Sequence, residues 1–346
     1  MGENVKAYYG EELKSTADLK TSACCTIDAL PSRVREVLPY IAEEIKERYY
    51  GCGSPIPPVL EGLHVLDLGC GTGRDSYVLS KLVGEEGFVY GLDFTESQIE
   101  TARKYRSSQA ERFGYNQSNV DFIHDAIENV GSYFSDNSLD LIISNCVLNL
   151  LPEKSKVFAE IFRILKPGGE LYFSDVFSGS RIPGGLMNDP VLHGECLAGA
   201  MYAEDFRRML AELGCPDYRV VEKRKISLDN PEIEKKIGMI DFYSLTVRAF
   251  KLENLEDICE DYGQTAVYLG TVPGQPHRFA LDDYHTFPTG KPVLVCGNTA
   301  AMLAETRLAP HFRVSGDRSV HYGPFDCSPV AHGEKETPGN SSGGCC

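Results

Sequence analysis

The chain has 346 residues, an apolar content of 42% and a formal net charge of −16. This length and composition predict a globular protein with one large core or two to three smaller ones. The acidic charge argues against nucleic acid and anionic membrane surfaces as partners, because both attract basic proteins.

The start of the chain lacks a basic segment followed by an apolar one, and no apolar run is long enough to span a bilayer. We therefore expect a cytoplasmic protein. Separately, we expect the protein to be a monomer. In a reducing compartment, the twelve cysteines indicate metal binding or redox chemistry more than a disulfide framework. No two of them have C-x-x-C spacing, so a thiol site must combine distant segments.

Residues 64–176 alternate short apolar runs with amphipathic segments. Five strands are expected, at residues 64–68, 88–93, 119–124, 139–144 and 170–176. The expected helices are residues 74–83, one long helix with Thr95 as its N-cap, and one that ends near Lys166. Strands alternating with helices favour parallel pairing, so we predict a doubly wound, Rossmann-like α/β sheet.

The rest of the chain predicts additions to this sheet. Residues 204–213 are expected to be a helix, and residues 218–228 and 242–252 antiparallel strands at the sheet edge. The loop 178–200 is too long for a mere connection, which favours a functional role. From residue 253 prolines and glycines increase, and strands at 265–269 and 292–296 indicate a small β-rich domain.

These features divide the chain into five parts. They are an N-terminal segment, a cofactor-binding domain, an added substrate region, a small C-terminal domain and a polar tail, at residues 1–52, 53–178, 179–252, 253–332 and 333–346.

A glycine-rich turn, Asp67-Leu68-Gly69-Cys70-Gly71-Thr72-Gly73, follows the first predicted strand. Its G-x-G-x-G spacing is tighter than the G-x-G-x-x-G of dinucleotide sites. Asp93 and Asp125 end the next two strands, where carboxylates can meet ribose hydroxyls and an adenine amino group. A cofactor that carries a sulfonium cation and no phosphates favours such an acidic rim.

This ordered set resembles the class I S-adenosylmethionine-dependent methyltransferases over residues 64–176. The resemblance implies that Asp67, Gly69 and Gly71 meet the methionine part of S-adenosyl-L-methionine and that Asp93 binds the ribose. It also implies that Phe94 flanks the adenine, that Asp125 and Ala126 meet its edge, and that Asn145 faces the transferring methyl group. A nicotinamide cofactor is the competing interpretation of the glycines.

Four cysteines stand in distinctive contexts. Cys24 follows Asp-Leu-Lys-Thr, Cys52 lies in Tyr-Tyr-Gly-Cys-Gly, Cys146 in Asn-Cys-Val-Leu-Asn-Leu, and Cys196 in Gly-Glu-Cys. Because ligands bind at the carboxyl ends of parallel strands, Cys146 should point toward the methyl group. Together these motifs resemble the arsenite S-adenosylmethionine methyltransferases over residues 18–252, and the terminal Gly-Gly-Cys-Cys resembles them too.

That resemblance implies an enzyme of arsenic detoxification that methylates trivalent arsenic or its thiol conjugates. Cys146 and Cys196 would hold the arsenic, with Cys52 able to add a third thiolate. Cys24 and Cys52 would act as a redox pair, reopened by a co-substrate thiol such as glutathione or thioredoxin. Tyr50 would pack over the cofactor, and antimonite is a further candidate substrate.

Two other functions compete with this one. A methyltransferase acting on a carbon, oxygen or nitrogen acceptor would make the cysteines incidental, and a non-catalytic arsenic-binding module would make the cofactor motif vestigial. Cys70 and Cys215 are expected to be packing residues. No motif assigns a role to Cys25, Cys259, Cys296 or Cys327, and Cys345 and Cys346 are expected to be idle on the polar tail.

Overall fold

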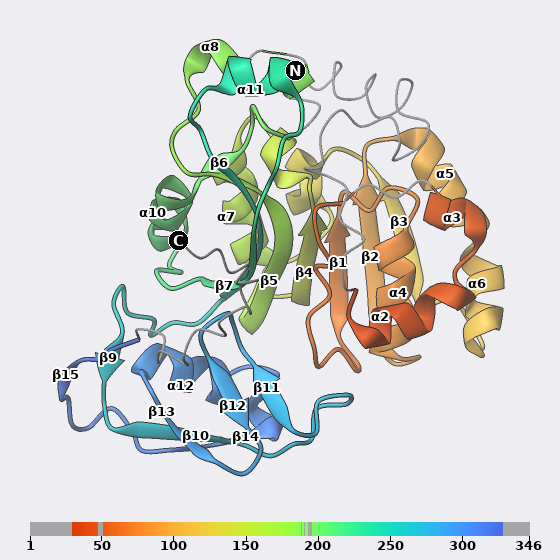
Figure 1. Ribbon diagram of the computed structural model, residues 1–346. Helices are drawn as coiled ribbons and strands as arrows, with labels where there is room; N and C mark the ends of the chain where they lie inside the picture. Colours follow the sequence, from red (N-terminus) through yellow and green to blue (C-terminus); the bar gives the residue numbers. More distant parts are fainter. Residues whose placement is uncertain (1–29, 48–50, 188, 190, 193–195, 328–346) are drawn as a thin grey trace, which may run out of the picture.

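A computed structural model describes residues 30–47, 51–187, 189, 191–192 and 196–327 (Figure 1). Two predicted site residues, Cys24 and Tyr50, lie outside these ranges, as does the predicted tail. Among the described residues, every helix is too short or too polar to cross a membrane.

The main sheet has eight strands, in the order β3-β2-β1-β4-β5-β8-β7, with β6 paired to β5. Their bounds are β1 His64–Leu68, β2 Phe88–Asp93, β3 Val120–His124, β4 Leu139–Asn145, β5 Leu165–Ser178, β6 Met201–Tyr202, β7 Arg219–Lys225 and β8 Phe242–Phe250. The first five strands in the order pair in parallel, whereas β8 pairs antiparallel with β5 and with β7. The predicted doubly wound sheet and its antiparallel edge are confirmed.

Two helices, α2 Ser32–Val37 and α3 Glu43–Glu47, precede β1. The helices between the strands are α4 Arg74–Val83, α5 Glu96–Lys104, α6 Arg106–Phe113, α7 Lys154–Ile164, α8 Gly184–Met187, α10 Ala203–Glu212 and α11 Pro231–Ile237. In Figure 1, α2 and α4 lie on one side of the sheet, whereas α7 and α10 accompany the strands near β5.

The prediction of a single long helix after Thr95 is wrong. The segment forms two helices, α5 and α6, which are separated by Tyr105 with a ψ of −2°. The hydroxyl of Tyr105 donates to Glu44 Oε2 of α3 at 2.5 Å. Thr95 does occupy the N-cap position, but its side chain makes no capping hydrogen bond.

Alternation along the strands explains the two apolar layers. Side chains of successive strand residues point to opposite faces of a sheet. Accordingly, Leu66 and Ile142 belong to the buried cluster on the α7 side, whereas Val65, Leu141 and Ile143 belong to the cluster that includes α4. Both faces of the central strands are therefore covered.

The C-terminal region is the predicted β-rich unit. It contains a three-stranded antiparallel sheet, β13-β10-β14, and two strand pairs, β11–β12 and β9–β15. The bounds are β9 Glu260–Asp261, β10 Gln264–Tyr268, β11 Arg278–Ala280, β12 Thr286–Pro288, β13 Pro292–Val295, α12 Gly297–Ala304, β14 Phe312–Ser315 and β15 Gly323–Pro324. Helix α12, which the sequence analysis did not include, begins immediately after Cys296.

A buried ionic cluster joins this region to the main sheet. Glu170 of β5 is fully buried, and its carboxylate accepts from Arg248 Nε of β8 at 2.7 Å and lies 2.5 Å from Arg307 Nη2. Burial alone raises the pKa of Glu170, but the charges of both arginines outweigh it and lower the pKa. The C-terminal region is thus attached near the amino end of β5.

Candidate active site

The glycine turn follows β1 at the carboxyl edge of the sheet. Gly69 and Cys70 donate their backbone N–H groups to Leu92 O of β2, at 2.8 and 3.1 Å. Gly69 has a φ of +74°, and a Cβ there would lie 2.4 Å from Val147 Cγ2. Gly71 has a φ of +55°, and its N–H donates to Asp93 Oδ2 at 3.0 Å. The turn therefore needs glycine both for its backbone angles and for close packing.

Buried carboxyl groups surround this turn. Asp67, Asp75 and Asp93 are each less than a tenth exposed. Burial, helped by the charge of Asp75, raises the pKa of Asp67 to about 7, and burial also raises the pKa of Asp93. A cationic sulfonium group would relieve this concentration of acid, whereas a phosphate would be repelled. The donor set therefore fits S-adenosylmethionine better than a dinucleotide.

The predicted adenine ligands lie next to this rim. Asp125 N donates to Asp93 O at 3.1 Å, which places the ends of β2 and β3 together. The Asp125 carboxylate accepts from Tyr133 Oη at 2.6 Å and from Ala126 N at 2.7 Å. The bond from Tyr133 is the main reason that the pKa of Asp125 is lowered. Phe94 O lies 3.0 Å from His124 Nε2 in the same loop region.

Cys52 and Cys146 meet at the end of β4. Their sulfur atoms form a disulfide, with the two Cα atoms 5.7 Å apart although 94 residues separate them in sequence. Cys146 is held in place by its backbone N–H, which donates to Ser174 O of β5 at 2.8 Å. The redox pair predicted from sequence, Cys24 with Cys52, stays a prediction because Cys24 lies outside the described residues.

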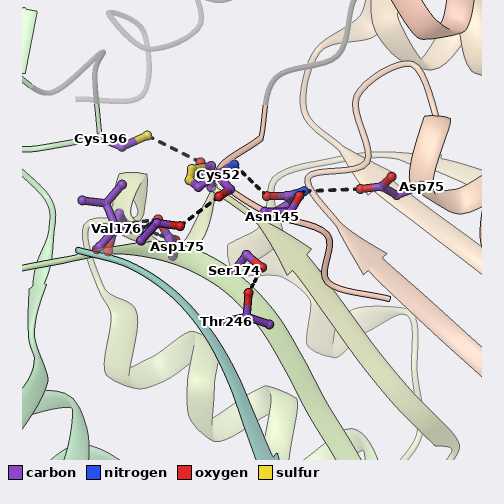
Figure 2. The surroundings of a disulfide bond; sticks show 12 residues. Cys52, Asp75, Asn145, Ser174, Asp175, Val176, Cys196 and Thr246 are labelled. Carbon is purple, nitrogen blue, oxygen red and sulfur yellow. Dashed lines mark hydrogen bonds between the residues drawn. A yellow bond between two sulfur atoms is a disulfide. The ribbon is translucent and has the colours of Figure 1, made fainter. Parts of the chain in front are cut away.

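Cys196 joins this pair from the long loop that follows β5. Its thiol donates to Cys146 O at 3.6 Å, and its side chain is fully buried (Figure 2). Cys146 and Cys196 both have left-handed backbone angles, with φ of 58° and 60°. Non-glycine residues in this region carry backbone strain, which is concentrated at functional sites. Three of the four predicted thiol residues therefore lie in one buried cluster. The Cys196 sulfur contacts the backbone of Cys146, whereas the ligand atoms that all lie within 4.8 Å of one another belong to Cys52, Cys146 and Asp175.

Asn145 connects the thiols to the acidic rim. Its Oδ1 accepts from Cys52 N at 3.0 Å, and its Nδ2 donates to Gly53 O at 3.0 Å and to Asp75 Oδ2 at 3.3 Å. Figure 2 shows it between Asp75 and Cys52. In this structure the amide fixes the Cys52 loop, and the predicted position of Asn145 facing the methyl group stays a prediction.

Asp175 was missed by the sequence analysis. A carboxylate oxygen of this fully buried residue lies within 4.8 Å of the sulfur atoms of Cys52 and Cys146. The carboxylate accepts from Asn149 Nδ2 at 2.7 Å and from Val176 N at 2.8 Å. Burial raises the pKa of Asp175 to about 7. Its position at the carboxyl end of the fifth predicted strand was the only available signal.

A cavity of about 210 Å³ lies on the other side of Cys52. Its wall combines apolar side chains of the N-terminal segment with polar groups of β5, β7 and β8. The lining residues are Leu30, Pro31, Cys52, Gly53, Ser54, Ile56, Tyr172, Val221, Glu222, Arg224, Ser244 and Thr246.

Comparisons with known proteins agree with this geometry. Residues 60–214 match the family model described as a methyltransferase domain, and residues 262–346 match an arsenite methyltransferase C-terminal domain. The chain is 46% identical over 348 aligned positions to an arsenite methyltransferase of Aquipseudomonas alcaligenes, covering 100% of both chains. It is 42% identical to the Homo sapiens arsenite methyltransferase, covering 90% of this chain and 83% of that protein.

A solved structure extends the likeness to the fold. The arsenic(III) S-adenosylmethionine methyltransferase of Chlamydomonas reinhardtii superposes with a TM-score of 0.84 at 50% identity, over 86% of this chain and 100% of that one. The resemblance expected from the glycine turn and the cysteine motifs is confirmed. The chain belongs to the arsenite methyltransferase family.

Proposed function

We propose that this protein transfers the methyl group of S-adenosylmethionine to trivalent arsenic held by its own cysteine thiolates. The observation that carries the proposal is the meeting of Cys52, Cys146 and Cys196 beside the glycine turn and its buried acids. The arsenite and arsenic(III) methyltransferases to which the chain is similar support the same substrate.

The chain's own residues suit the methyl donor. We assign the glycine backbones and Asp67 to its methionine part, Asp93 to the ribose, and Phe94, Asp125 and Ala126 to the adenine. When bound, this cofactor supplies an electrophilic methyl group on a sulfonium sulfur. Asp67 would offset that positive charge, since it is buried and close to the turn, whereas Asp75 is already paired with the buried Arg74.

Cysteine suits the acceptor because trivalent arsenic is soft and binds thiolates in preference to oxygen ligands. Each thiol that replaces a hydroxyl of arsenite forms an As–S bond, and its proton leaves with the hydroxyl as water. Arsenic bound by Cys146 and Cys196, with Cys52 as a third ligand, keeps a lone pair that can take the methyl group. No general base is then required, provided that the protein aligns the two reactants.

Methyl transfer formally oxidises arsenic from the trivalent to the pentavalent state. Two thiolates that close to a disulfide supply the two electrons that return it to the trivalent state. Cys52 is the common member of the two available pairs, because it is bonded to Cys146 here and is predicted to pair with Cys24.

An external thiol must then reopen this disulfide, and glutathione or thioredoxin is the proposed co-substrate. Cys52 lines the cavity of about 210 Å³, and we propose that a small thiol approaches the bond from that side. This requirement for reduced thiols is why we propose a cytoplasmic location.

The test is incubation of the reduced protein with arsenite, glutathione or thioredoxin, and methyl-labelled cofactor, followed by speciation of arsenic. We expect labelled methylarsenicals whose formation stops after one turnover when the thiol is left out. Label found only in an organic acceptor would favour the competing methyltransferase, and arsenic binding without transfer would favour the non-catalytic module. Replacing arsenite by antimonite tests whether the site accepts a second three-coordinate thiophilic ion.

A further inference from the structure

Three cysteines to which the sequence analysis assigned no role gather in the C-terminal region. The sulfur atoms of Cys259, Cys296 and Cys327 all lie within 4.8 Å of one another. Cys259 precedes β9, Cys296 precedes α12, and Cys327 follows β15. Such a meeting of three distant thiols is unusual for packing residues, since cysteines that serve as small apolar groups need not face one another.

The local fold brings the three segments together. Strands β9 and β15 pair antiparallel, and Phe325 N donates to Cys259 O at 2.8 Å, so Cys327 returns beside Cys259. Cys296 is the N-cap of α12, and its sulfur accepts from Thr299 N at 3.5 Å. The cluster is thus built on strand pairing and on a helix end rather than on a single loop.

The surroundings favour a negatively charged sulfur. Arg219 Nη2 lies 3.9 Å from Cys296 Sγ, and the first turn of α12 directs its N–H groups toward it. Hydrogen bonds from Cys259 and Cys327 lower the pKa of Cys296, and the same bond to Cys296 raises the pKa of Cys259. The geometry of the group therefore presents one thiolate and two thiols to a thiophilic ion.

The number of converging sulfurs fits trivalent arsenic. Within the described residues, no histidine or carboxylate completes the group of three sulfurs. Structural zinc is almost always held by four protein ligands in a tetrahedron. Trivalent arsenic takes three ligands and keeps a lone pair, so three converging thiolates would satisfy it completely.

We propose that Cys259, Cys296 and Cys327 form a second arsenic site, which binds inorganic trivalent arsenic as a trithiolate in the C-terminal region. The thiol cluster stands independently of the proposed methylation, but the choice of arsenic over another thiophilic ion rests on that function.

The second site is remote from the proposed reaction. The C-terminal region packs at the amino end of β5, where Arg307 meets Glu170, whereas Asp175 lies beside the catalytic thiols farther along the same strand. Cys296 contacts Arg219 of β7, which pairs with Arg248 of β8, and Arg248 pairs in turn with Tyr172 of β5. The second site therefore lies two strands away from β5, at a level three residues before Asp175. Arsenic bound at the C-terminal cysteines is therefore held away from the methyl donor, as a reservoir.

The number of bonds that arsenic can form with sulfur should make this site prefer arsenite to monomethylated arsenic. Arsenite can exchange all three hydroxyls for sulfur, but monomethylated arsenic has one position blocked by carbon and can engage only two of the three thiolates. We expect the C-terminal site to bind arsenite at least about tenfold more tightly than monomethylated arsenic, since one As–S bond is missing. The site would then retain the starting substrate and release product.

The experiment counts arsenic bound to the reduced, full-length chain after removal of free arsenite. We expect two equivalents in the unchanged protein and one in each of Cys259→Ser, Cys296→Ser and Cys327→Ser. Cys215→Ser, which alters a buried cysteine outside both clusters, should keep two. A Cys345→Ser, Cys346→Ser double variant should also keep two equivalents. Loss of one equivalent in this double variant would contradict the three-thiol assignment.

Arsenic X-ray absorption then identifies the ligands. In Cys196→Ser, which lacks a catalytic thiol, the remaining tightly bound arsenic should have three sulfur neighbours. Oxygen neighbours, two equivalents in Cys296→Ser, or zinc that arsenite fails to displace would each overturn the second site. Failure of methylation with a three-sulfur arsenic still present would contradict only the proposed function, so the two failures are distinguishable.

Discussion

Two groups of three cysteines in this chain have opposite settings. Cys52, Cys146 and Cys196 lie at the carboxyl edge of the main sheet, beside the glycine turn, and two of them have strained, left-handed backbones. Cys259, Cys296 and Cys327 lie at a strand pair and a helix end, and none of them has a positive φ. The first group adjoins the acids suited to a methyl donor, and the second does not.

This difference teaches that thiol chemistry alone does not make a methylation site. Both groups can satisfy a thiophilic ion. On our proposal only the first receives the methyl group, because Asn145 ties Cys52 to Asp75 beside the glycine turn. Substitutions can test the thiols, the cofactor-binding acids and the buried ionic cluster one at a time.

The largest expected effect is the loss of a catalytic thiol. Cys146→Ser or Cys196→Ser should lower methylation of arsenite and of monomethylated arsenic by about a thousandfold or more, because a serine hydroxyl is a poor ligand for soft arsenic. Labelled methyl transfer measures this, with Cys215→Ser as the matched control. Full activity in either catalytic variant would exclude the two-thiolate site.

Cys24→Ser should have a different signature. It should slow the first methylation while sparing arsenic binding, because Cys24 is predicted to act in reduction rather than in coordination. Arsenic stoichiometry and single-turnover rates distinguish the two roles. Loss of bound arsenic in this variant would show that Cys24 is a ligand instead.

Breaking the buried ionic cluster between the C-terminal region and the main sheet should lower the stability of the protein strongly. Glu170→Ala leaves Arg248 and Arg307 buried without their carboxylate, which should cost about 3–5 kcal/mol of unfolding free energy. Chemical denaturation measures this loss. Lys156→Ala, which breaks the exposed pair with Glu153, is the control and should change stability by less than about 1 kcal/mol. Equal effects would mean that the buried cluster does not hold the regions together.

A substitution among the acids around the glycine turn should weaken cofactor binding without changing any thiol. Asp93→Ala removes the acceptor of Gly71 N and the proposed ribose ligand, so affinity for S-adenosylmethionine should fall about 10- to 100-fold. Calorimetric titration measures the affinity, and arsenic stoichiometry should stay at the unchanged protein's value. Cofactor binding of unchanged strength would remove Asp93 from the site.

The most gradual effect is a pH dependence. The pKa of Asp67 is about 7 in the folded protein against an ordinary value of 3.8, so its contribution to stability is full below about pH 4 and is lost as the pH rises to about 7. Stability of the cofactor-free protein should fall by at most about 1.4 kcal/mol per pH unit from this group. Asp67→Asn should make that slope shallower in denaturation curves, whereas an unchanged slope would assign it to other groups such as Asp175.

Much of the fold follows from local patterns. The bounds of α4 and β2 agree with the predicted residues 74–83 and 88–93, because a glycine turn and clear periodicity delimit both. The break at Tyr105 could not be predicted, since it accompanies a tertiary contact with Glu44. Helix α12 was missed because its small residues, Gly297 to Ala301, have little amphipathic pattern.

The candidate site shows the same limit. The clustering of Cys146 with Cys196 could be predicted because specific motifs surround both residues, and Cys146 also follows a buried strand. Asp175 has no motif, and its importance depends on sulfur atoms contributed by Cys52 and Cys146. The C-terminal thiols are farther still from prediction, because only the pairing of β9 with β15 brings Cys327 to Cys259.

One measurement tests the central claim most directly. In a single turnover, the reduced protein is loaded with arsenite and methyl-labelled cofactor, and protein-bound arsenic is analysed by native mass spectrometry. We predict labelled methylarsenic in the unchanged protein, and unmethylated arsenic in a Cys146→Ser, Cys196→Ser double variant that keeps its C-terminal thiols. Methylation of arsenic in that double variant at the unchanged rate, or label on an organic acceptor alone, would contradict the account.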